Sequence, residues 1–333
     1  MSEPTKIGLT GAGGLGMHLS RGFEDTEDAV VHAVADVSDE SRNRAGERLD
    51  IPEDRRYSDH IEMLDDAELD GVVVATPHTF HYEQTLAALE REIDTLCEKP
   101  MTTDLADAED LVRRAEDSSA TLMIGYQRHL DSAFLTAKEA LAEEVGEPTF
   151  ITAEVTQNWI ATQRGTWRTN PDLSGGGQLY DTGSHLLDVV LWTTGLTPVA
   201  VDAQMLFDDD EDRVDVQAAL TVTFENGAVA SVAVSGDTPT VREHLHVWGD
   251  NGGFFVEGED WDPRKIRFIA PDGGERQPRL DRWGSKNKAQ AFVDVIRDGA
   301  EPPATPRDAL KVTAVTEAAY ESARTGKRVD IDL

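Results

Sequence analysis

The chain of 333 residues is longer than one ordinary hydrophobic core supports and fits two domains. Its hydrophobic fraction of 39% argues against global disorder, and no apolar run approaches the roughly 20 residues of a membrane-spanning helix. The single cysteine, Cys97, excludes an internal disulfide and a cysteine-based metal cluster, so we interpret it as a small buried apolar residue.

Acidic residues outnumber basic ones by 64 to 31, which gives a formal net charge of -33. Because the acids are spread along the chain and lysine is scarce, we expect a halophilic-type acidic surface; an ordinary acidic protein stays the alternative. The charge would repel phosphates, so no nucleic-acid partner is expected. Residues 1–6 show no signal-peptide pattern, so we expect a cytoplasmic protein without a membrane partner.

The first third of the sequence alternates short apolar strands with segments of helical spacing. This rhythm indicates parallel βαβ units and a Rossmann domain over residues 1–125. The predicted strands are 6–10, 30–35, 71–75, 95–97 and 122–124, and the clearest predicted helices are 82–91 and 105–116.

After about residue 126 the pattern changes to longer strands joined by short turns such as Asn226-Gly227, which favour antiparallel pairing. We therefore predict an α+β domain with a largely antiparallel sheet over residues 126–333. Its predicted strands are 149–156, 199–206, 214–224, 228–234, 244–248 and 328–331, with helices at 289–297 and 307–324.

A glycine motif, Gly11-Ala12-Gly13-Gly14-Leu15-Gly16, follows the first strand and opens a helix. Gly11 permits the tight turn, Gly13 lets the backbone approach a pyrophosphate, and Gly16 allows close packing of helix on strand. The free N–H groups at the helix start suit the phosphates. We therefore predict dinucleotide binding by Gly11, Gly13, Gly14, Leu15 and Gly16.

Asp36 stands twenty residues after Gly16, at the end of the second strand. A carboxylate at this place holds the adenosine ribose hydroxyls and repels a 2′-phosphate. Alone, Asp36 is equally well explained as a helix cap, but the glycine motif favours the binding role. NAD is the expected cofactor, and the nearby Arg42 and Arg44 leave NADP open.

Three further segments carry residues suited to chemistry. Residues 75–81 (ATPHTFH) lie at the end of one predicted strand, and Glu98-Lys99-Pro100 lie at the end of the next strand. Residues 174–188 begin a helix in the second domain. Asp181 and His185 are four residues apart and would share one helix face. A histidine can take a hydroxyl proton while hydride leaves the same carbon, and a lysine can stabilise the developing alkoxide.

In this order the three segments resemble the Gfo/Idh/MocA oxidoreductase family, the glucose–fructose oxidoreductase and inositol dehydrogenase group. The resemblance implies that Lys99, Asp181 and His185 form the catalytic set and that His81 lies near the cofactor. It also implies a small sugar or polyol substrate and a homodimer or homotetramer. Further residues expected at the cofactor are Thr76, Pro77, Glu98 and Lys99, and those expected at the substrate are Gln127, Arg128, Trp167 and Arg168.

Each of these residues also has an ordinary structural explanation. Lys99 fits a solvated strand end, Asp181 a helix cap, His185 a core histidine and Trp167 a core aromatic residue. Residues 175–177, three glycines, fit a flexible loop, although their position suggests close approach to a ligand. His78 and His81 supply too few ligands for a metal, so no metal is expected.

The leading interpretation is a dehydrogenase that transfers hydride between NAD(P) and a secondary hydroxyl of a sugar or polyol. A second is an NAD-dependent hydrolase or lyase in which a transient oxidation assists bond cleavage. A third is a non-catalytic sensor or repressor that uses the cofactor site as a ligand switch. Intact Lys99, Asp181 and His185 count against the third.

Overall fold

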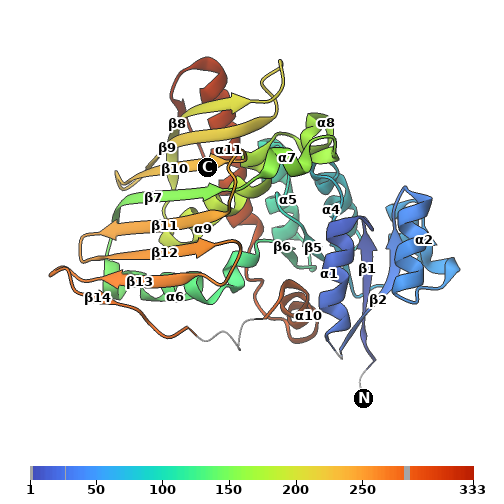
Figure 1. Ribbon diagram of the computed structural model, residues 1–333. Helices are drawn as coiled ribbons and strands as arrows, with labels where there is room; N and C mark the ends of the chain where they lie inside the picture. Colours follow the sequence, from blue (N-terminus) through green and yellow to red (C-terminus); the bar gives the residue numbers. More distant parts are fainter. Residues whose placement is uncertain (1–2, 27, 281–285) are drawn as a thin grey trace. The chain divides into compact units, whose positions relative to one another are not determined.

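The computed structural model describes residues 3–26, 28–280 and 286–333. The chain forms two compact units (Figure 1). Unit 1 comprises Met1–Thr102, Ala106–Gln127 and Lys286–Ala309, and unit 2 comprises Thr103–Leu105, Arg128–Ser285 and Leu310–Leu333. None of the helices among the described residues is long and apolar enough to cross a membrane.

Unit 1 is built on a six-stranded parallel sheet with the order β3-β2-β1-β4-β5-β6. The order reverses beside β1, which pairs with both β2 and β4, as in a Rossmann domain. The strands are β1 (Thr5–Thr10), β2 (Ala29–Ala35), β3 (Arg56–Tyr57), β4 (Gly71–Val74), β5 (Asp94–Cys97) and β6 (Leu122–Ile124).

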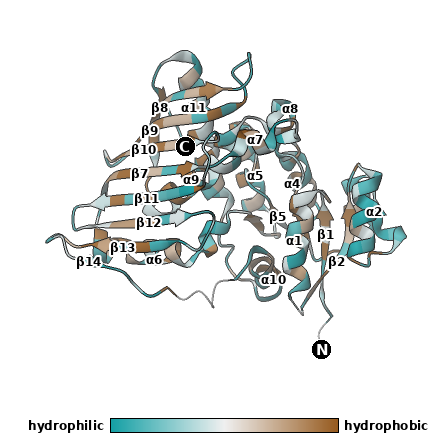
Figure 2. Ribbon diagram, viewed as in Figure 1, coloured by the Kyte–Doolittle hydropathy of each residue, from teal (hydrophilic) through white to brown (hydrophobic). Residues whose placement is uncertain are grey.

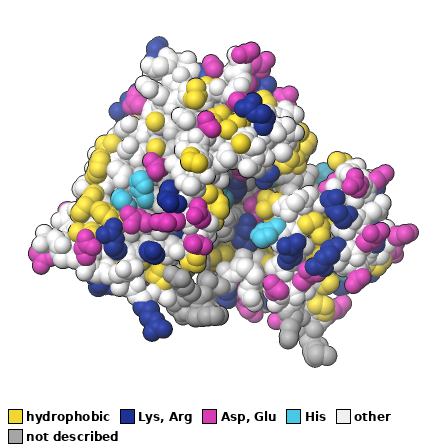
Figure 3. Space-filling view, viewed as in Figure 1, with side chains coloured by type: hydrophobic (Ala, Val, Ile, Leu, Met, Phe, Trp, Pro, Cys, Tyr) yellow, Lys and Arg dark blue, Asp and Glu magenta, His cyan; other side chains and the backbone are white. Residues whose placement is uncertain are grey.

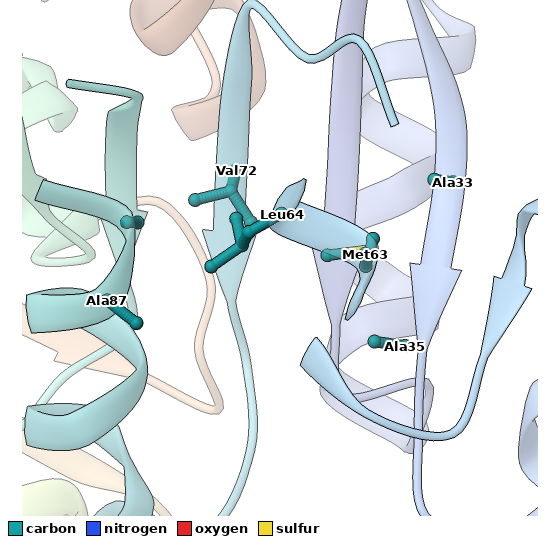
Figure 4. Packing of buried hydrophobic residues seen from close by; sticks show 7 residues of the cluster. Ala33, Ala35, Met63, Leu64, Val72 and Ala87 are labelled. Carbon is teal, nitrogen blue, oxygen red and sulfur yellow. The ribbon is translucent and has the colours of Figure 1, made fainter. Parts of the chain in front are cut away.

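Helices cover this sheet, as parallel strands require because they bury both faces. All four residues of β4 are buried, and Met63 and Leu64 pack with Val72 in the core (Figure 4). Caps set the helix starts: the Ser38 and Asp59 side chains accept backbone N–H groups at α2 and α3. The helices are α1 (Gly14–Glu24), α2 (Asp39–Arg48), α3 (His60–Asp66), α4 (His81–Leu89), α5 (Leu105–Asp117) and α10 (Lys288–Asp298).

Helix α10 departs from the predicted division of the chain at residue 125, which placed it in the second domain. It belongs to unit 1, where it packs against α1 and β1. A Cβ atom on Gly22 would lie 2.9 Å from the Cβ of Ala289, so the helices approach closely at a glycine. Its Phe292 side chain is fully buried, and this apolar face needs the core of the Rossmann sheet.

Unit 2 contains a nine-stranded sheet with the order β14-β13-β12-β11-β7-β10-β9-β8-β15. All neighbours pair antiparallel except β7 and β10, which are parallel. The predicted fold class is therefore confirmed. The strands are β7 (Pro148–Thr156), β8 (Pro198–Phe207), β9 (Asp215–Phe224), β10 (Val229–Ser235), β11 (Arg242–Gly249), β12 (Gly253–Glu259), β13 (Lys265–Ile269), β14 (Glu275–Arg276) and β15 (Val329–Asp330).

One face of this sheet carries helices and the other does not (Figure 1). Along β7, Ile151, Ala153 and Val155 are buried beneath α9, whereas the alternate residue Phe150 is 48% exposed. The colouring by hydropathy follows the same alternation in several strands (Figure 2). The helices are α6 (Ser132–Ala140), α7 (Trp159–Gln163), α8 (Pro171–Ser174), α9 (Ser184–Thr194) and α11 (Pro306–Thr325).

A buried ion cluster joins β11 to the residues before α6. Glu243 forms ion pairs with Arg128 and Arg264, each with an N–O distance of 2.5 Å, and Arg264 also forms an ion pair with Asp131 at 3.1 Å. Arg128 is 2% exposed and Glu243 is 5% exposed. Charges at such depth are tolerated only in pairs, so these side chains fix how the loop before α6 meets the sheet.

We predict that Glu243→Gln strongly destabilises unit 2, because the buried Arg128 would lose its ion-pair partner and Arg264 would keep only Asp131. The expected loss of unfolding free energy is about 3–5 kcal/mol. Urea denaturation in molar KCl measures it. Glu24→Gln removes the same charge from the exposed pair with Arg48 and serves as the control, with an expected cost of about 1 kcal/mol or less. Equal shifts in the two variants would contradict a structural role for the cluster.

Candidate active site

The glycine loop between β1 and α1 has the geometry that dinucleotide binding requires. Gly11 has a φ of 91°, and a Cβ atom there would lie 2.7 Å from the carbonyl oxygen of Ala75. A Cβ on Gly16 would lie 1.9 Å from the carbonyl oxygen of Gly11. Only glycine fits either position, so the loop packs tightly on β4 and on itself.

Gly13 and Gly14 differ from these two. Among the described residues, no heavy atom lies within 4 Å of where a Cβ would stand on either, and both are exposed. Helix α1 starts at Gly14, followed by the half-buried Leu15, and Gly13 at its N-cap contributes no side-chain hydrogen bond. The space beside these two glycines at the amino end of α1 is therefore open, which leaves room for a phosphate at the start of the helix.

Asp36 follows β2 and binds the backbone of the glycine loop. Its Oδ2 atom accepts the Ala12 N–H at 2.7 Å, and its Oδ1 atom accepts the Ser38 N–H at 2.8 Å. Arg42 donates to the Asp36 carbonyl oxygen at 2.6 Å and pairs with the Asp39 carboxylate. The carboxylate thus lies beside the amino end of α1, and the Arg42 guanidinium is engaged in local contacts.

The segment after β4 is held by His81. Its Nδ1 atom lies 2.7 Å from the Pro100 carbonyl oxygen and its Nε2 atom 2.9 Å from that of Thr76. His81 is 1% exposed, and burial lowers its pKa. Both ring nitrogens therefore face backbone carbonyl oxygens, and the place of His81 near the cofactor stays a prediction. Pro77 and the buried His78 complete this turn.

Glu98 is almost fully buried and forms an ion pair with Lys288, the first residue of α10. Lys288 also donates to the Gly125 carbonyl oxygen at 3.3 Å, and the Glu98 carboxylate accepts the Lys99 N–H at 3.3 Å. A Cβ on Gly125 would lie 2.9 Å from that carboxylate. The backbone of Lys99 is therefore fixed by a lysine from the far end of the sequence.

Asp181 and His185 lie on one continuous helical segment, but it does not begin as the α-helix that the spacing suggested. Residues Leu179–Gly183 form a π-turn, and α9 starts at Ser184, so His185 is its second residue. A π-turn closes over five residues rather than four, and such turns are frequent at functional sites. Both side chains are buried.

The Asp181 carboxylate is bound by two side chains. Its Oδ2 atom accepts the Trp159 indole N–H at 2.8 Å and lies 3.0 Å from the Arg168 Nε atom. The Arg168 guanidinium lies over the Trp167 ring, 4.5 Å from its centroid. Arg168 and Trp167, expected at the substrate, are therefore brought to Asp181 within unit 2.

Two other expected substrate residues lie differently. Gln127 is exposed and is the last residue of the segment Ala106–Gln127 of unit 1. Arg128 is enclosed in the ion cluster with Glu243, which gives it a structural role in place of the expected contact with substrate. Among the described residues, no group of three or more His, Cys, Asp or Glu side chains is arranged to hold a metal ion.

The glycines at 175–177 pack against protein atoms rather than leaving space for a ligand. A Cβ on Gly175 would lie 2.4 Å from Thr103, one on Gly176 2.3 Å from the Tyr320 hydroxyl, and one on Gly177 2.0 Å from the Asp215 carbonyl oxygen. Close packing within unit 2 thus accounts for the three glycines, in contrast to the suggested approach to a ligand.

Sequence reasoning missed Lys288 and Trp159. Lys288 is one of only eight lysines in an acid-rich chain and opens an amphipathic helix, which is a usable signal. Trp159 follows two polar residues, Gln157 and Asn158, and its sequence gives no sign of the Asp181 contact. Lys99 belongs to unit 1, and Asp181 and His185 belong to unit 2.

Two family models match the chain. Residues 5–126 match the oxidoreductase family with an NAD-binding Rossmann fold, and residues 134–255 match the GFO/IDH/MocA C-terminal domain. Together they cover most of both units.

Curated relatives align over most of their length. Scyllo-inositol 2-dehydrogenase (NADP(+)) IolW of Bacillus subtilis is 26% identical, covering 86% of this chain and 85% of the relative. D-xylose 1-dehydrogenase (NADP(+)) 2 of Haloferax volcanii is 25% identical, covering 98% and 99%.

Among solved structures, the aldose-aldose oxidoreductase of Caulobacter crescentus, complexed with glycerol, superposes with a TM-score of 0.85. It is 25% identical and covers 99% of this chain and 100% of that one. The glycine loop, the Glu98-Lys99-Pro100 turn, the Asp181 and His185 segment and both matched domains lead to one conclusion: the chain belongs to the Gfo/Idh/MocA family of oxidoreductases.

Proposed function

We propose that the chain is an NAD(P)-dependent dehydrogenase that oxidises a secondary hydroxyl of a sugar or polyol. The observation that carries the proposal is that both family domains match, and the chain carries Lys99, Asp181 and His185, which the family resemblance expects as the catalytic set. The names of relatives support the substrate class, since they include inositol, xylose and apiose dehydrogenases.

The residues of unit 1 fit a nicotinamide dinucleotide. Gly13, Gly14 and the amino end of α1 would hold the pyrophosphate, and the Asp36 carboxylate would accept hydrogen bonds from the adenosine ribose. The bound nicotinamide supplies the hydride acceptor. NAD is the preferred form in this proposal because Asp36 would repel a 2′-phosphate, although two relatives named above carry NADP(+) in their names.

The proposed chemistry assigns one task to each of two side chains. His185 takes the hydroxyl proton as hydride leaves the same carbon, so that the alcohol becomes a carbonyl and one proton stays on the imidazole. Lys99 donates a hydrogen bond to the oxygen and stabilises its negative charge in the transition state. The contacts of Glu98 with Lys288 and the Lys99 N–H support this role, because they fix the lysine backbone.

Asp181 has a supporting role in this proposal. Its carboxylate is already bound to Trp159 and Arg168, which limits its movement and offsets its charge. From that position it stabilises the imidazolium of His185 once the proton has been taken. Arg168 stays a proposed substrate contact through its remaining guanidinium N–H groups.

We also propose that a second copy of the chain covers the helix-free face of the sheet in unit 2, giving a homodimer or homotetramer. Phe150 and Trp248 are cross-strand partners on this face and are 48% and 39% exposed. Trp248 packs edge-on against Phe255, which stacks on His246. Exposed aromatic residues gathered in this way are typical of protein interfaces.

The acidic surface is proposed to be an adaptation to high salt. Asp and Glu side chains are scattered over the visible surface of both units (Figure 3), and no single tail holds the charge. Salt would screen their mutual repulsion.

We predict that the native protein reduces NAD with at least one member of a polyol and aldose panel in molar KCl, and that Lys99→Ala lowers kcat about 100- to 1000-fold. We expect the lower kcat because the variant lacks the Lys99 amino group that donates a hydrogen bond to the reacting oxygen. Initial rates of NADH formation measure it, and NADH fluorescence tests whether binding persists. Lys265→Ala, a change at an exposed strand residue, is the control.

Full activity of the Lys99→Ala variant would sink the mechanism. Product release without net NADH would instead indicate the hydrolase or lyase alternative with transient oxidation. Tight NADH binding with no turnover of any panel compound would favour a sensor.

Asp36→Asn should weaken the preference for NAD over NADP about tenfold, because it removes one like charge near a 2′-phosphate while keeping a side chain of equal size. The ratio of kcat/KM for the two cofactors measures this. Glu47→Gln removes an exposed charge from α2, the helix that follows Asp36, and should leave the ratio unchanged. A ratio unaffected by Asp36→Asn would refute the assignment of cofactor preference to this carboxylate.

One salt series tests the surface and the assembly together. We expect the thermal midpoint to rise steadily with KCl, because screening lowers the self-repulsion of a net charge of -33. Light scattering in molar KCl should give two or four times the chain mass of 36.4 kDa. A midpoint independent of KCl would count against salt adaptation, and a monomer mass would count against pairing of the sheets.

A further inference from the structure

Asp215, the first residue of β9, has a buried carboxylate to which the proposed mechanism gives no task. It is fully enclosed, with an exposed fraction of 0%. Its Oδ1 atom accepts the Gly177 N–H at 3.1 Å, and its Oδ2 atom accepts the Leu179 N–H at 2.9 Å. A carboxylate whose two oxygens both accept N–H groups of one short backbone segment fixes that segment in place.

The Tyr320 hydroxyl of α11 completes this arrangement. It donates a short hydrogen bond to Asp215 Oδ1, and its oxygen lies 2.8 Å from the Gly177 nitrogen. Burial raises the pKa of Tyr320 well above its ordinary value, so the hydroxyl keeps its proton and remains a donor. Burial also raises the pKa of Asp215 to about 6, against the opposing effect of its hydrogen bonds, so the group is mostly charged at neutral pH.

The two N–H groups that Asp215 binds open the helical segment that carries Asp181 and His185. Gly177 precedes the segment, and Leu179 is the first residue of its π-turn. The Asp181 N–H in turn donates to the Gly177 carbonyl oxygen at 3.1 Å. Because the first N–H groups of a helix have no partner within it, an outside carboxylate both satisfies them and sets where the helix begins.

The glycines beside this carboxylate leave room for it. Any side chain at Gly177 would collide with the Asp215 backbone, and any at Gly176 would collide with the Tyr320 hydroxyl. Strand β9, helix α11 and the turn that contains Gly176 and Gly177 can therefore pack in only one way. A shift of Asp215 would move the start of the segment and with it Asp181.

We propose that Asp215, held by Tyr320, is a positioning residue that fixes the Asp181 and His185 segment for hydride transfer. The proposal rests on the proposed function for the catalytic part. Asp215 does not contact substrate or cofactor in this account and acts only through the backbone of residues 177–179.

The test uses the whole chain of 333 residues with Asp215→Asn and Tyr320→Phe. In Asp215→Asn, an amide nitrogen replaces one acceptor oxygen. Its N–H group would face a backbone N–H, so that hydrogen bond would be lost. We expect kcat for the best panel substrate to fall about 100-fold in Asp215→Asn, as for a small misplacement of a catalytic group, and by less in Tyr320→Phe. NADH affinity should stay unchanged, since the residues proposed to hold it belong to unit 1.

Tyr180→Phe is the matched control. Tyr180 is also buried, and its ring lies 5.3 Å from that of Tyr320, but its hydroxyl donates to the Thr103 carbonyl oxygen instead. We expect Tyr180→Phe to keep kcat. If all three variants lost kcat equally, or if Asp215→Asn kept it, the positioning role would be wrong.

Hydrogen exchange of backbone amides separates this proposal from the proposed function. We expect the amides of Gly177 and Leu179 to exchange faster in Asp215→Asn and Tyr320→Phe than in the native protein or in Tyr180→Phe. If no panel compound is oxidised, the dehydrogenase proposal fails, and the exchange rates still decide whether Asp215 holds the segment. Unchanged exchange would overturn the inference even in an active enzyme. If Asp215→Asn does not fold, the exchange rates of Gly177 and Leu179 in Tyr320→Phe alone decide whether Asp215 holds the segment.

Discussion

The close packing of the glycine loop onto its own helix is the constraint on which unit 1 depends. Gly16 approaches the Gly11 carbonyl so closely that no side chain fits, and Gly11 approaches the end of β4 in the same way. Gly13 and Gly14, at the amino end of α1, stay exposed. The Asp36 carboxylate, which follows β2, binds the backbone of the loop. A dinucleotide site of this kind is therefore made by backbone geometry first and by side chains second.

The same logic recurs at the residues proposed to do the chemistry. Beside each of them, a charged group from a distant part of the chain fixes the backbone. Lys288 binds Glu98 across 190 residues, and Asp215 binds Leu179 across 36 residues. Buried charges of this type cost free energy unless they are paired, so their partners also restrict the backbone to one arrangement. In a chain with a net charge of -33, each buried carboxylate needs such a partner.

Local patterns made five of the six Rossmann strands and the glycine loop predictable, because a tight turn and its helix are determined by adjacent residues; the two-residue strand β3 (Arg56–Tyr57) is too short to show such a pattern. The family motifs pointed to Lys99, Asp181 and His185, whose catalytic roles stay predictions. Long-range contacts were not predictable: nothing near Arg128 in the sequence reveals that Glu243 encloses it, and nothing near Gly177 reveals Asp215. The π-turn at Leu179–Gly183 was missed because its hydrogen bonds span one residue more than those of an α-helix. The spacing of apolar residues does not distinguish the two over a single turn. Helix α10 was assigned to the second domain because order along the chain does not show which core an amphipathic helix joins.

In the proposed reaction, hydride passes directly from a carbon bearing a hydroxyl group to the nicotinamide. A substrate carrying deuterium on its carbinol carbons tests this transfer, with mass spectrometry of the cofactor after turnover in molar KCl. We expect the reduced cofactor to gain one deuterium on its nicotinamide ring, together with formation of a carbonyl product. Release of product with the deuterium retained in it or lost to water, and with no label in the cofactor, would rule out direct hydride transfer.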